Sequence, residues 1–475
     1  MASNDEPWRL TASELLAAYR SGELAPDDVI AGLLARIGAI DPALNAYVAL
    51  SPTAEAEAAR SAERWRRGAP IGPLDGVPVA VKDNLVVAGM PATFGSRLYA
   101  ARIPEADELP IERLRKAGAI VIGKTNTPEF AVEGVTRNAL FGSTGNPFAP
   151  ELTPGGSSGG SVAAVAAGLA PVAIGTDGGG STRRPAAYTG LIGLKPGIGH
   201  IARAGGLAQI LLDFEVVGTF ARSASDMRLL DDVLAGPDRR DPASLVRPAP
   251  PPRKPSLSIR LVERIGGAPC APEILAALHA FADELTAMGH EVTAGPLGID
   301  TAALAAVWPT IVETGLARIA ETEPDFAACA NPRYVEVAER GKSRRAAELL
   351  AALEAVSAAR RDAARLFEDC DVVLMPACAA MPWPRDEYFP TEIAGQTVGP
   401  RGHAVYTGWV NAAGLPGLTL PCQVPAGALP IGVQLIADRG GEGLLLDLAA
   451  ASEARRGSLF PHWPAIAQTA AAGAP

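Results

Sequence analysis

The chain has 475 residues, of which 48% are hydrophobic, 20% charged and only 5% aromatic, so it can bury a large core and is typical of a globular protein. Its 42 Lys and Arg against 52 Asp and Glu give a formal charge of −10. No basic run exceeds a pair of residues, and this excludes the usual charge pattern of a nucleic-acid partner.

The N-terminal segment MASNDEP is acidic and has no apolar stretch, so no secretory signal is predicted and a cytoplasmic location is expected. The most apolar window, 161–174, is shorter than the ~20 residues of a bilayer span, so no membrane partner is expected. The five cysteines and five histidines show no metal-ligand spacing. We therefore predict no disulfides and no metal site.

Helices are predicted first along the chain. Thr11 and Glu14 have the spacing of a capping box, and apolar residues then recur at helical spacing with a break near 22–26. Another helix is predicted over 54–67. The β-branched runs at 76–89 and 119–126 predict buried strands.

Glycine-rich residues 142–200 include apolar runs that predict a helix at 161–170 and a strand at 171–177. The proline-rich segment VRPAPPPRKP, at 246–255, is typical of an extended linker. Beyond it, the sequence predicts helices over 272–288, 302–320 and 346–367, and strands over 371–376 and 429–437. Alternating strands and helices at both ends of the chain predict the α/β class.

Two glycine-serine clusters lie at 155–161 and 178–181. Such clusters are more often turns than active sites, and the first lacks the Gly-Lys-Ser/Thr ending of a phosphate loop. In the second cluster, glycines would allow successive backbone N–H groups to point inward and bind an oxyanion.

Lys82 ends the apolar run 77–81 and is one of only six lysines. Burial would lower its pKa from the reference value of about 10.4, and a neutral lysine can act as a general base. An ion pair with Asp83, or a side chain that extends to solvent, is the alternative. His200 and His403 lie in no motif, so the histidine of a Ser-His-Asp triad is not apparent.

The pattern of Lys82, Ser157 and Ser181 resembles that of the amidase signature family. Residues 153–196, from TPGGSSGGS to LIGLKP, resemble the signature of that family throughout. The resemblance covers most of the chain and is poor only over about 256–370. Further matching segments are LDGVPVAVKDN near residue 80, IGKTNTPEF at 122–130, and parts of 221–242, 371–377 and 411–437.

This resemblance implies one α/β domain over 1–475, with a large mixed, twisted sheet flanked by helices. Its expected parts are an N-terminal helical region (about 1–70), a signature core (about 71–245), a variable helical region (about 256–370) and a C-terminal part that completes the sheet (371–475). The proline-rich segment is then a surface crossing within this domain.

The resemblance also implies residue roles. Ser181 resembles the nucleophile, Ser157 the bridging serine that follows a cis peptide bond, and Lys82 the base. The implied oxyanion hole is formed by the backbone N–H groups of Gly178, Gly179, Gly180 and Ser181, and the implied supporting residues are Ser158, Asp177 and Arg183. Arg184 departs from the family, which usually has an apolar residue there, and this raises the question of substrate polarity.

The expected function is hydrolysis of a small carboxylic amide, either an aryl or an alkyl amide, with esters or carbamates as related substrates, through an acyl-enzyme and without a cofactor. A monomer or homodimer is expected. One alternative is a glutamine-hydrolysing A subunit of a tRNA-dependent amidotransferase, and another is a non-catalytic binding protein on the same fold. Five aromatic residues either line the substrate pocket or anchor a long loop, namely Trp383, Tyr388, Phe389, Tyr406 and Trp409.

Overall fold

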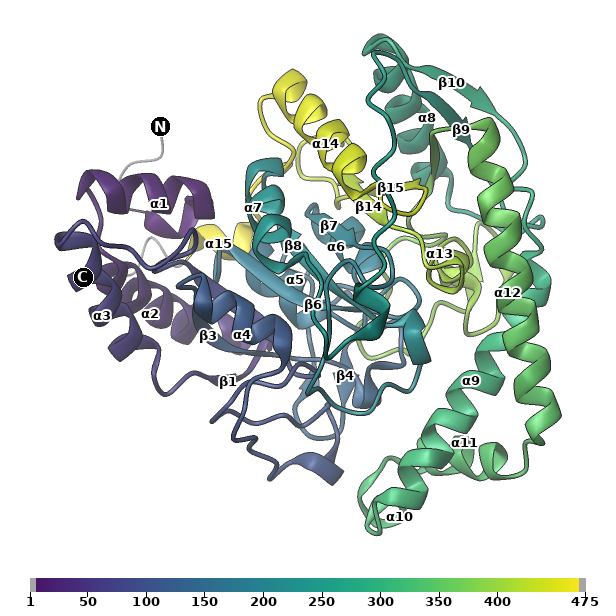
Figure 1. Cartoon of the computed structure of the whole chain (residues 1–475), viewed down its shortest axis with the longest axis horizontal. Helices are drawn as coiled ribbons and strands as arrows, with labels where there is room; N and C mark the ends of the chain where they lie inside the picture. Colours follow the sequence, from purple (N-terminus) through teal and green to yellow (C-terminus); the bar gives the residue numbers. More distant parts are fainter. Residues whose placement is uncertain (1–5, 470–475) are drawn as a thin grey trace.

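The computed structural model describes residues 6–469 and is built around one 11-stranded sheet (Figure 1). The strand order is β1-β3-β2-β6-β8-β7-β14-β15-β11-β9-β10. These strands are β1 (Tyr47–Leu50), β2 (Pro78–Lys82), β3 (Ile120–Thr125), β6 (Val172–Asp177), β7 (Ile192–Lys195), β8 (Val216–Ala221), β9 (Ser258–Leu261), β10 (Glu291–Ala294), β11 (Val372–Pro376), β14 (Gly417–Pro421) and β15 (Gly432–Ala437). Two short ribbons pair β4 (Arg137–Asn138) with β5 (Gly142–Ser143), and β12 (Glu392–Ile393) with β13 (Gln396–Thr397).

The sheet is mixed. Strand β2 is parallel to both β3 and β6, and β9 is parallel to both β10 and β11, whereas the other neighbouring strands are antiparallel. Strands from both sides of the proline-rich segment join this sheet. That continuity favours the predicted single domain over a division at 246–255.

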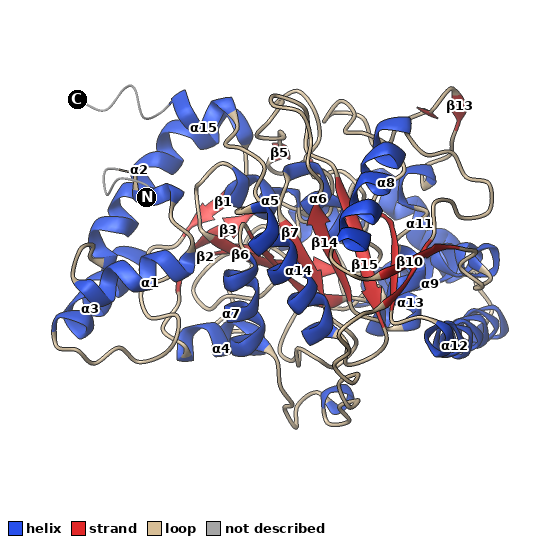
Figure 2. Cartoon of the chain, turned by 90° about the horizontal axis from the view of Figure 1, so that it is seen from above, coloured by secondary structure: helices blue, strands red, loops and turns tan. Residues whose placement is uncertain are grey.

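Helices cover both faces of the sheet, as Figure 2 shows. This confirms the predicted fold class. The helices are α1 (Ala12–Ser21), α2 (Pro26–Leu44), α3 (Ala54–Arg66), α4 (Leu109–Lys116), α5 (Gly159–Ala166), α6 (Arg183–Thr189), α7 (Ala224–Leu234), α8 (Pro272–Ala287), α9 (Thr301–Thr322), α10 (Phe326–Cys329), α11 (Pro332–Lys342), α12 (Ala346–Asp369), α13 (Gly408–Ala413), α14 (Glu442–Arg456) and α15 (Ala465–Thr469).

Each strand contributes side chains to both faces of the sheet, because successive side chains of a strand point to opposite sides. Val79 and Val81 of β2 pack in the core beneath α4, α7, α8 and α14, whereas Ala80 packs on the other side with α2 and α5. In the same way Val372 of β11 faces the first core, and Val373 faces the core formed with α9, α11 and α12.

Strand β2 is shorter than the predicted run 76–89. After Lys82 the chain turns, because the Leu85 N–H donates to the Lys82 carbonyl oxygen and polar residues replace the apolar alternation. Lys82 therefore stands at the end of a buried strand, beside the turn.

The predicted N-terminal helices are confirmed, and Thr11 and Glu14 form the expected capping box. Helix α9 is long and apolar enough to span a membrane by length and composition alone. Half of its most apolar window is buried, and the helix packs against α11 and α12. It is thus built into the fold as a core helix.

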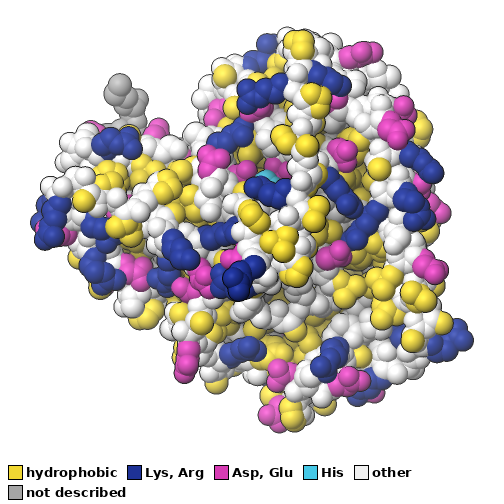
Figure 3. Space-filling model, viewed as in Figure 1, with side chains coloured by type: hydrophobic (Ala, Val, Ile, Leu, Met, Phe, Trp, Pro, Cys, Tyr) yellow, Lys and Arg dark blue, Asp and Glu magenta, His cyan; other side chains and the backbone are white. Residues whose placement is uncertain are grey.

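Residues 246–255 form no helix or strand and are almost entirely exposed, as expected of a surface crossing. On the face shown in Figure 3, basic and acidic side chains are interspersed. That face carries no continuous basic surface of the kind that binds a polyanion.

Candidate active site

Lys82 is the last residue of β2 and is completely buried. Its Nζ donates hydrogen bonds to Ser157 Oγ at 2.8 Å and to Thr176 Oγ1 at 2.9 Å. Burial lowers the pKa of Lys82 to about 7, although the charges of Glu215 and Asp177 act to raise it. A large fraction of this amine is therefore neutral at physiological pH, as a general base requires.

Lys82 neither pairs with Asp83 nor extends to solvent. The neighbouring Asp83 pairs with Lys124, whose Nζ lies 3.0 Å from Asp83 Oδ1, and both side chains are buried. The Lys82 side chain does not reach solvent. The amine is thus buried among hydroxyl groups.

Thr176 and its neighbours were not identified from the sequence. Asn84 Nδ2 donates to Thr176 Oγ1 at 2.9 Å and lies 3.4 Å from Glu215 Oε1. Glu215 is in turn paired with Arg203 at 2.5 Å. The only sequence signal for Thr176 is a hydroxyl residue near the end of an apolar strand, so its role depends on which strands become neighbours in the sheet.

Ser157 follows a cis peptide bond between Gly156 and Ser157, as the family resemblance implied. The next residue, Ser158, donates from Oγ to the Thr176 carbonyl oxygen at 3.2 Å, and α5 starts at Gly159. The glycine-serine segment is thereby joined to the end of β6.

Ser181 lies in the loop between β6 and α6, and Asp177 shapes this loop. The Asp177 carboxylate accepts the backbone N–H groups of Gly180 at 2.6 Å and Thr182 at 3.0 Å. The expectation for Gly180 therefore needs correction, because its N–H points to Asp177 and is not available to an oxyanion. Gly178, Gly179 and Ser181 remain as candidate donors.

Arg183 fixes the same loop to the C-terminal part of the chain. It pairs with Asp177 at 3.1 Å and donates to Gln434 Oε1 of β15 at 2.9 Å and to Asn411 Oδ1 at 2.5 Å. Burial acts to raise the pKa of Asp177, but the charge and hydrogen bonds of Arg183 hold it well below its usual range. Asp177 and Arg183 thus form a fully buried ion pair, consistent with a supporting role.

Ser181 opens onto a cavity of about 710 Å³. Helices α9 and α11 contribute much of its wall, and both lie within 256–370, the expected variable helical region. Other wall residues come from 131–134, from the Ser181 loop and from 399–405. Of the six predicted pocket residues, only Arg184 lines this cavity.

The five aromatic residues do not line this cavity, which corrects the pocket prediction. Trp383 is buried against Tyr188 and donates from Nε1 to the Glu387 carbonyl oxygen at 2.9 Å. Tyr406 donates to the Glu263 carbonyl oxygen at 2.9 Å. These contacts join the loop to Tyr188 of α6 and to the segment that follows β9.

The remaining three aromatic residues also lie outside the cavity wall. Trp409 lines an adjoining pocket, which shares Trp308, Arg401, Ala404 and Val405 with this cavity. Tyr388 is covered by the Arg333 guanidinium at 4.3 Å, and Phe389 is partly buried. The same loop contributes residues 399–405 to the cavity wall.

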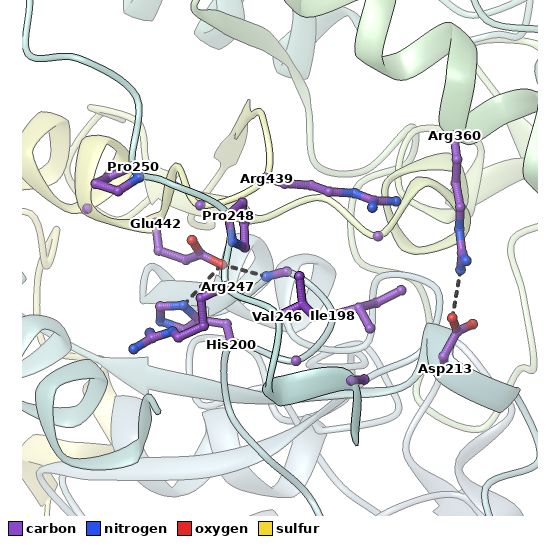
Figure 4. A pocket seen from close by; sticks show the side chains of 16 residues that line it. Ile198, His200, Asp213, Val246, Arg247, Pro248, Pro250, Arg360, Arg439 and Glu442 are labelled. Carbon is purple, nitrogen blue, oxygen red and sulfur yellow. Dashed lines mark hydrogen bonds and ion pairs between the residues drawn. The ribbon is translucent and has the colours of Figure 1, made fainter. Parts of the chain in front are cut away.

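His200 belongs to another pocket of about 670 Å³, shown in Figure 4. Its Nε2 lies 2.8 Å from Asp231 Oδ1, and its Nδ1 lies 3.4 Å from Glu442 Oε1. Burial lowers the pKa of His200, but Asp231 and Glu442 outweigh it and raise the pKa. None of Lys82, Ser157 and Ser181 lines this pocket, so His200 is not a partner of the serines.

Within residues 6–469, no group of three or more His, Cys, Asp or Glu side chains is arranged to hold a metal ion. The site instead combines a buried amine of lowered pKa, a hydroxyl group in contact with it, and a serine at a cavity beside backbone N–H groups. These are the components of nucleophilic attack on a carbonyl carbon, followed by stabilisation of the resulting oxyanion.

Comparison with known proteins gives matches over nearly the whole chain. The family model described as Amidase matches residues 28–446. The chain is 34% identical to the A subunit of the glutamyl-tRNA(Gln) amidotransferase from Synechococcus sp. (strain CC9605), covering 93% of this chain and 95% of the relative. It is 35% identical to the indoleacetamide hydrolase of Bradyrhizobium diazoefficiens, and the match covers 95% of this chain and 87% of that relative. The structure of a bacterial aryl acylamidase of the amidase signature family superposes on this chain with a TM-score of 0.86 and 28% identity. The superposition covers 98% of this chain and 99% of that structure.

Proposed function

Because the chain belongs to the amidase signature family, we propose that it hydrolyses a small carboxylic amide through an acyl-enzyme on Ser181. The observation that carries the proposal is the buried Lys82 amine, with a pKa of about 7, hydrogen-bonded to Ser157. A lysine in this state can take a proton at neutral pH.

In the proposed reaction, Ser157 transfers the Ser181 proton to Lys82 as Ser181 Oγ attacks the amide carbon. The N–H groups of Gly178, Gly179 and Ser181 receive the developing oxyanion. The relay then returns the proton to the leaving amine, which departs and leaves an ester on Ser181. Water activated by the same relay cleaves this ester and releases the acid.

Thr176 and Asn84 are proposed as positioning residues. Thr176 Oγ1 accepts hydrogen bonds from both Lys82 Nζ and Asn84 Nδ2, which fixes the amine beside Ser157. Esters and carbamates share the tetrahedral chemistry and are included as candidate substrates.

The test of this function is the Ser181→Ala variant, assayed for ammonia release and for labelling by a fluorophosphonate. Activity should fall at least about a thousand-fold, because the attacking oxygen is lost. The melting temperature should stay close to that of the wild type, since Ser181 is a small side chain in a loop. Turnover near the wild-type rate in Ser181→Ala would show that another residue is the nucleophile.

The similarity to amidotransferase A subunits supports a second candidate, in which the substrate is glutamine and a partner protein uses the ammonia. Assaying the purified chain alone with glutamine and with aryl and alkyl amides separates the two. A non-catalytic binding protein is the remaining alternative. Folded wild-type protein that forms no fluorophosphonate adduct and cleaves none of these amides would support it.

A further inference from the structure

The charges around the Ser181 cavity do not balance. Its wall contains four arginines and two glutamates, namely Arg184, Arg333, Arg340, Arg401, Glu133 and Glu313. Arg333 lies 3.0 Å from Glu133, and Arg340 lies 2.9 Å from Glu313. Arg184 and Arg401 have no carboxylate partner among residues 6–469.

Arg184 is the more deeply buried of these two arginines, with 6% of its surface exposed. Its Nη1 donates to the Gly179 carbonyl oxygen at 2.7 Å and to Thr407 Oγ1 at 3.1 Å. Its Nε is buried and has no hydrogen-bond partner within the described part of the chain. The guanidinium is thus held by neutral groups and keeps one donor unused.

Two further wall residues have unused binding capacity. Arg401 is exposed, and its guanidinium lies over the Trp308 ring at 5.4 Å from the ring centre. His403 is buried, and neither of its ring nitrogens has a partner among residues 6–469. Burial holds the pKa of His403 well below its usual value, so the ring is neutral and adds no charge.

A buried positive charge without a counter-charge is costly, and a guanidinium does not lose its proton to avoid this cost. A carboxylate is its best-matched ligand, because its two oxygens fit the planar donors of arginine. We propose that the cavity binds amides that carry a carboxylate group, with Arg184 and Arg401 as the residues that select it. This inference rests on the proposed amide hydrolysis at Ser181.

The position of Arg184 limits the length of the substrate. Besides Gly179, its guanidinium contacts the Gly156 carbonyl oxygen at 3.4 Å, so it lies against the two loops that carry Ser181 and Ser157. A Cβ atom added to Gly180 would lie only 2.8 Å from Arg184 Nη1. The carboxylate must therefore be only a few bonds from the reacting carbonyl, as in the monoamide of a short dicarboxylic acid.

The test compares succinamate with succinamide, and malonamate with malonamide, because each pair differs only by a carboxylate in place of a carboxamide. For wild-type protein, kcat/KM should be at least about tenfold higher for the charged member of the better pair. Arg184→Gln should reduce kcat/KM for that monoamide by about 10- to 100-fold and reduce the value for the diamide much less.

Arg222→Gln is the matched control. Arg222 is also a buried arginine held by backbone carbonyl oxygens, those of Val165 and Ala170, and it does not line the cavity. The Arg222→Gln substitution should leave the preference for the charged amide unchanged, even if the melting temperature falls. If Arg184→Gln fails to fold, the wild type still gives an answer, since succinate or malonate should inhibit diamide hydrolysis competitively.

Three outcomes would overturn the carboxylate site while leaving amide hydrolysis intact. These are a wild-type preference for the diamides, an equal loss on both substrates in Arg184→Gln, and no inhibition by dicarboxylates at concentrations on the order of 10 mM. A failure of the proposed function differs from all three. If amide hydrolysis itself is the wrong function, the wild type cleaves neither class of amide and Ser181 forms no fluorophosphonate adduct.

Discussion

Replacing Glu215 by Gln should shift the pH dependence of the enzyme toward lower pH. If neutral Lys82 is the base, kcat/KM should rise with pH along a limb centred at the pKa of Lys82, which is about 7. The negative charge of Glu215 raises this pKa. Its removal favours the neutral amine, and the charge of Arg203, no longer offset by Glu215, acts in the same direction.

The size of the shift follows from the hydrogen-bond chain between the two groups. Lys82 Nζ donates to Thr176 Oγ1 at 2.9 Å, and Asn84 Nδ2 donates to Thr176 Oγ1 at 2.9 Å and to Glu215 Oε1 at 3.4 Å. The charges are therefore separated by no more than about 9 Å, which at an effective dielectric constant of about 20 gives an interaction of at least about 1.8 kcal/mol. That energy corresponds to a fall of about 1.3 in the pKa of Lys82.

The assay is kcat/KM for a neutral amide between about pH 5 and pH 9, so that the substrate itself does not titrate. For the wild type, activity at about pH 5 should be near 1% of the plateau if one group with a pKa of about 7 controls the limb. The midpoint for Glu215→Gln should lie near pH 6. Glu284→Gln is the matched control, because Glu284 is likewise a largely buried carboxylate paired with an arginine, Arg456, at 2.5 Å.

A midpoint for Glu215→Gln that stays in place or rises would refute the role of Glu215 in raising the pKa of Lys82. That role is also refuted if Glu284→Gln moves the midpoint by the same amount, since the effect would then not depend on proximity to Lys82.

Lys82→Arg should be inactive near neutral pH although it keeps the positive charge, because a guanidinium does not release its proton; substantial turnover would make Lys82 a structural cation. Asp177→Asn should lower the free energy of unfolding by about 3 to 5 kcal/mol in urea titrations, because it leaves Arg183 buried and unpaired. A loss below about 1 kcal/mol would contradict that account. Gly180→Ala should reduce kcat strongly, because the residue has φ +115° and the added Cβ would lie 2.3 Å from Thr407 Oγ1. An unchanged kcat would show that the loop adapts freely.

The parts of this protein that depend on local sequence pattern could be predicted from the sequence alone. Capping at Thr11 and Glu14, the buried strands that end at Lys82 and Asp177, and helices α8, α9 and α12 of the variable region follow from spacing and residue type, whereas α10 and α11 were not predicted. The family resemblance singled out Lys82, Ser157 and Ser181, because their segments are contiguous motifs. The expected cis bond before Ser157 is present.

The tertiary structure decided which distant residues meet. Thr176 contacts Lys82 because β6 pairs with β2, and Glu215 lies nearby because β8, which it precedes, pairs with β6. The cavity wall contains residues of α9 and α11 and none of the five aromatic residues of 383–409, of which Trp383 and Tyr406 instead donate hydrogen bonds to backbone carbonyl oxygens. Arg183 is paired, whereas its neighbour Arg184 has no counter-ion in the described part of the chain, and this difference depends on contacts with residues up to about 250 positions away. Such pairings arise only from packing, because the charge and size of a side chain do not specify which partner the folded chain brings to it.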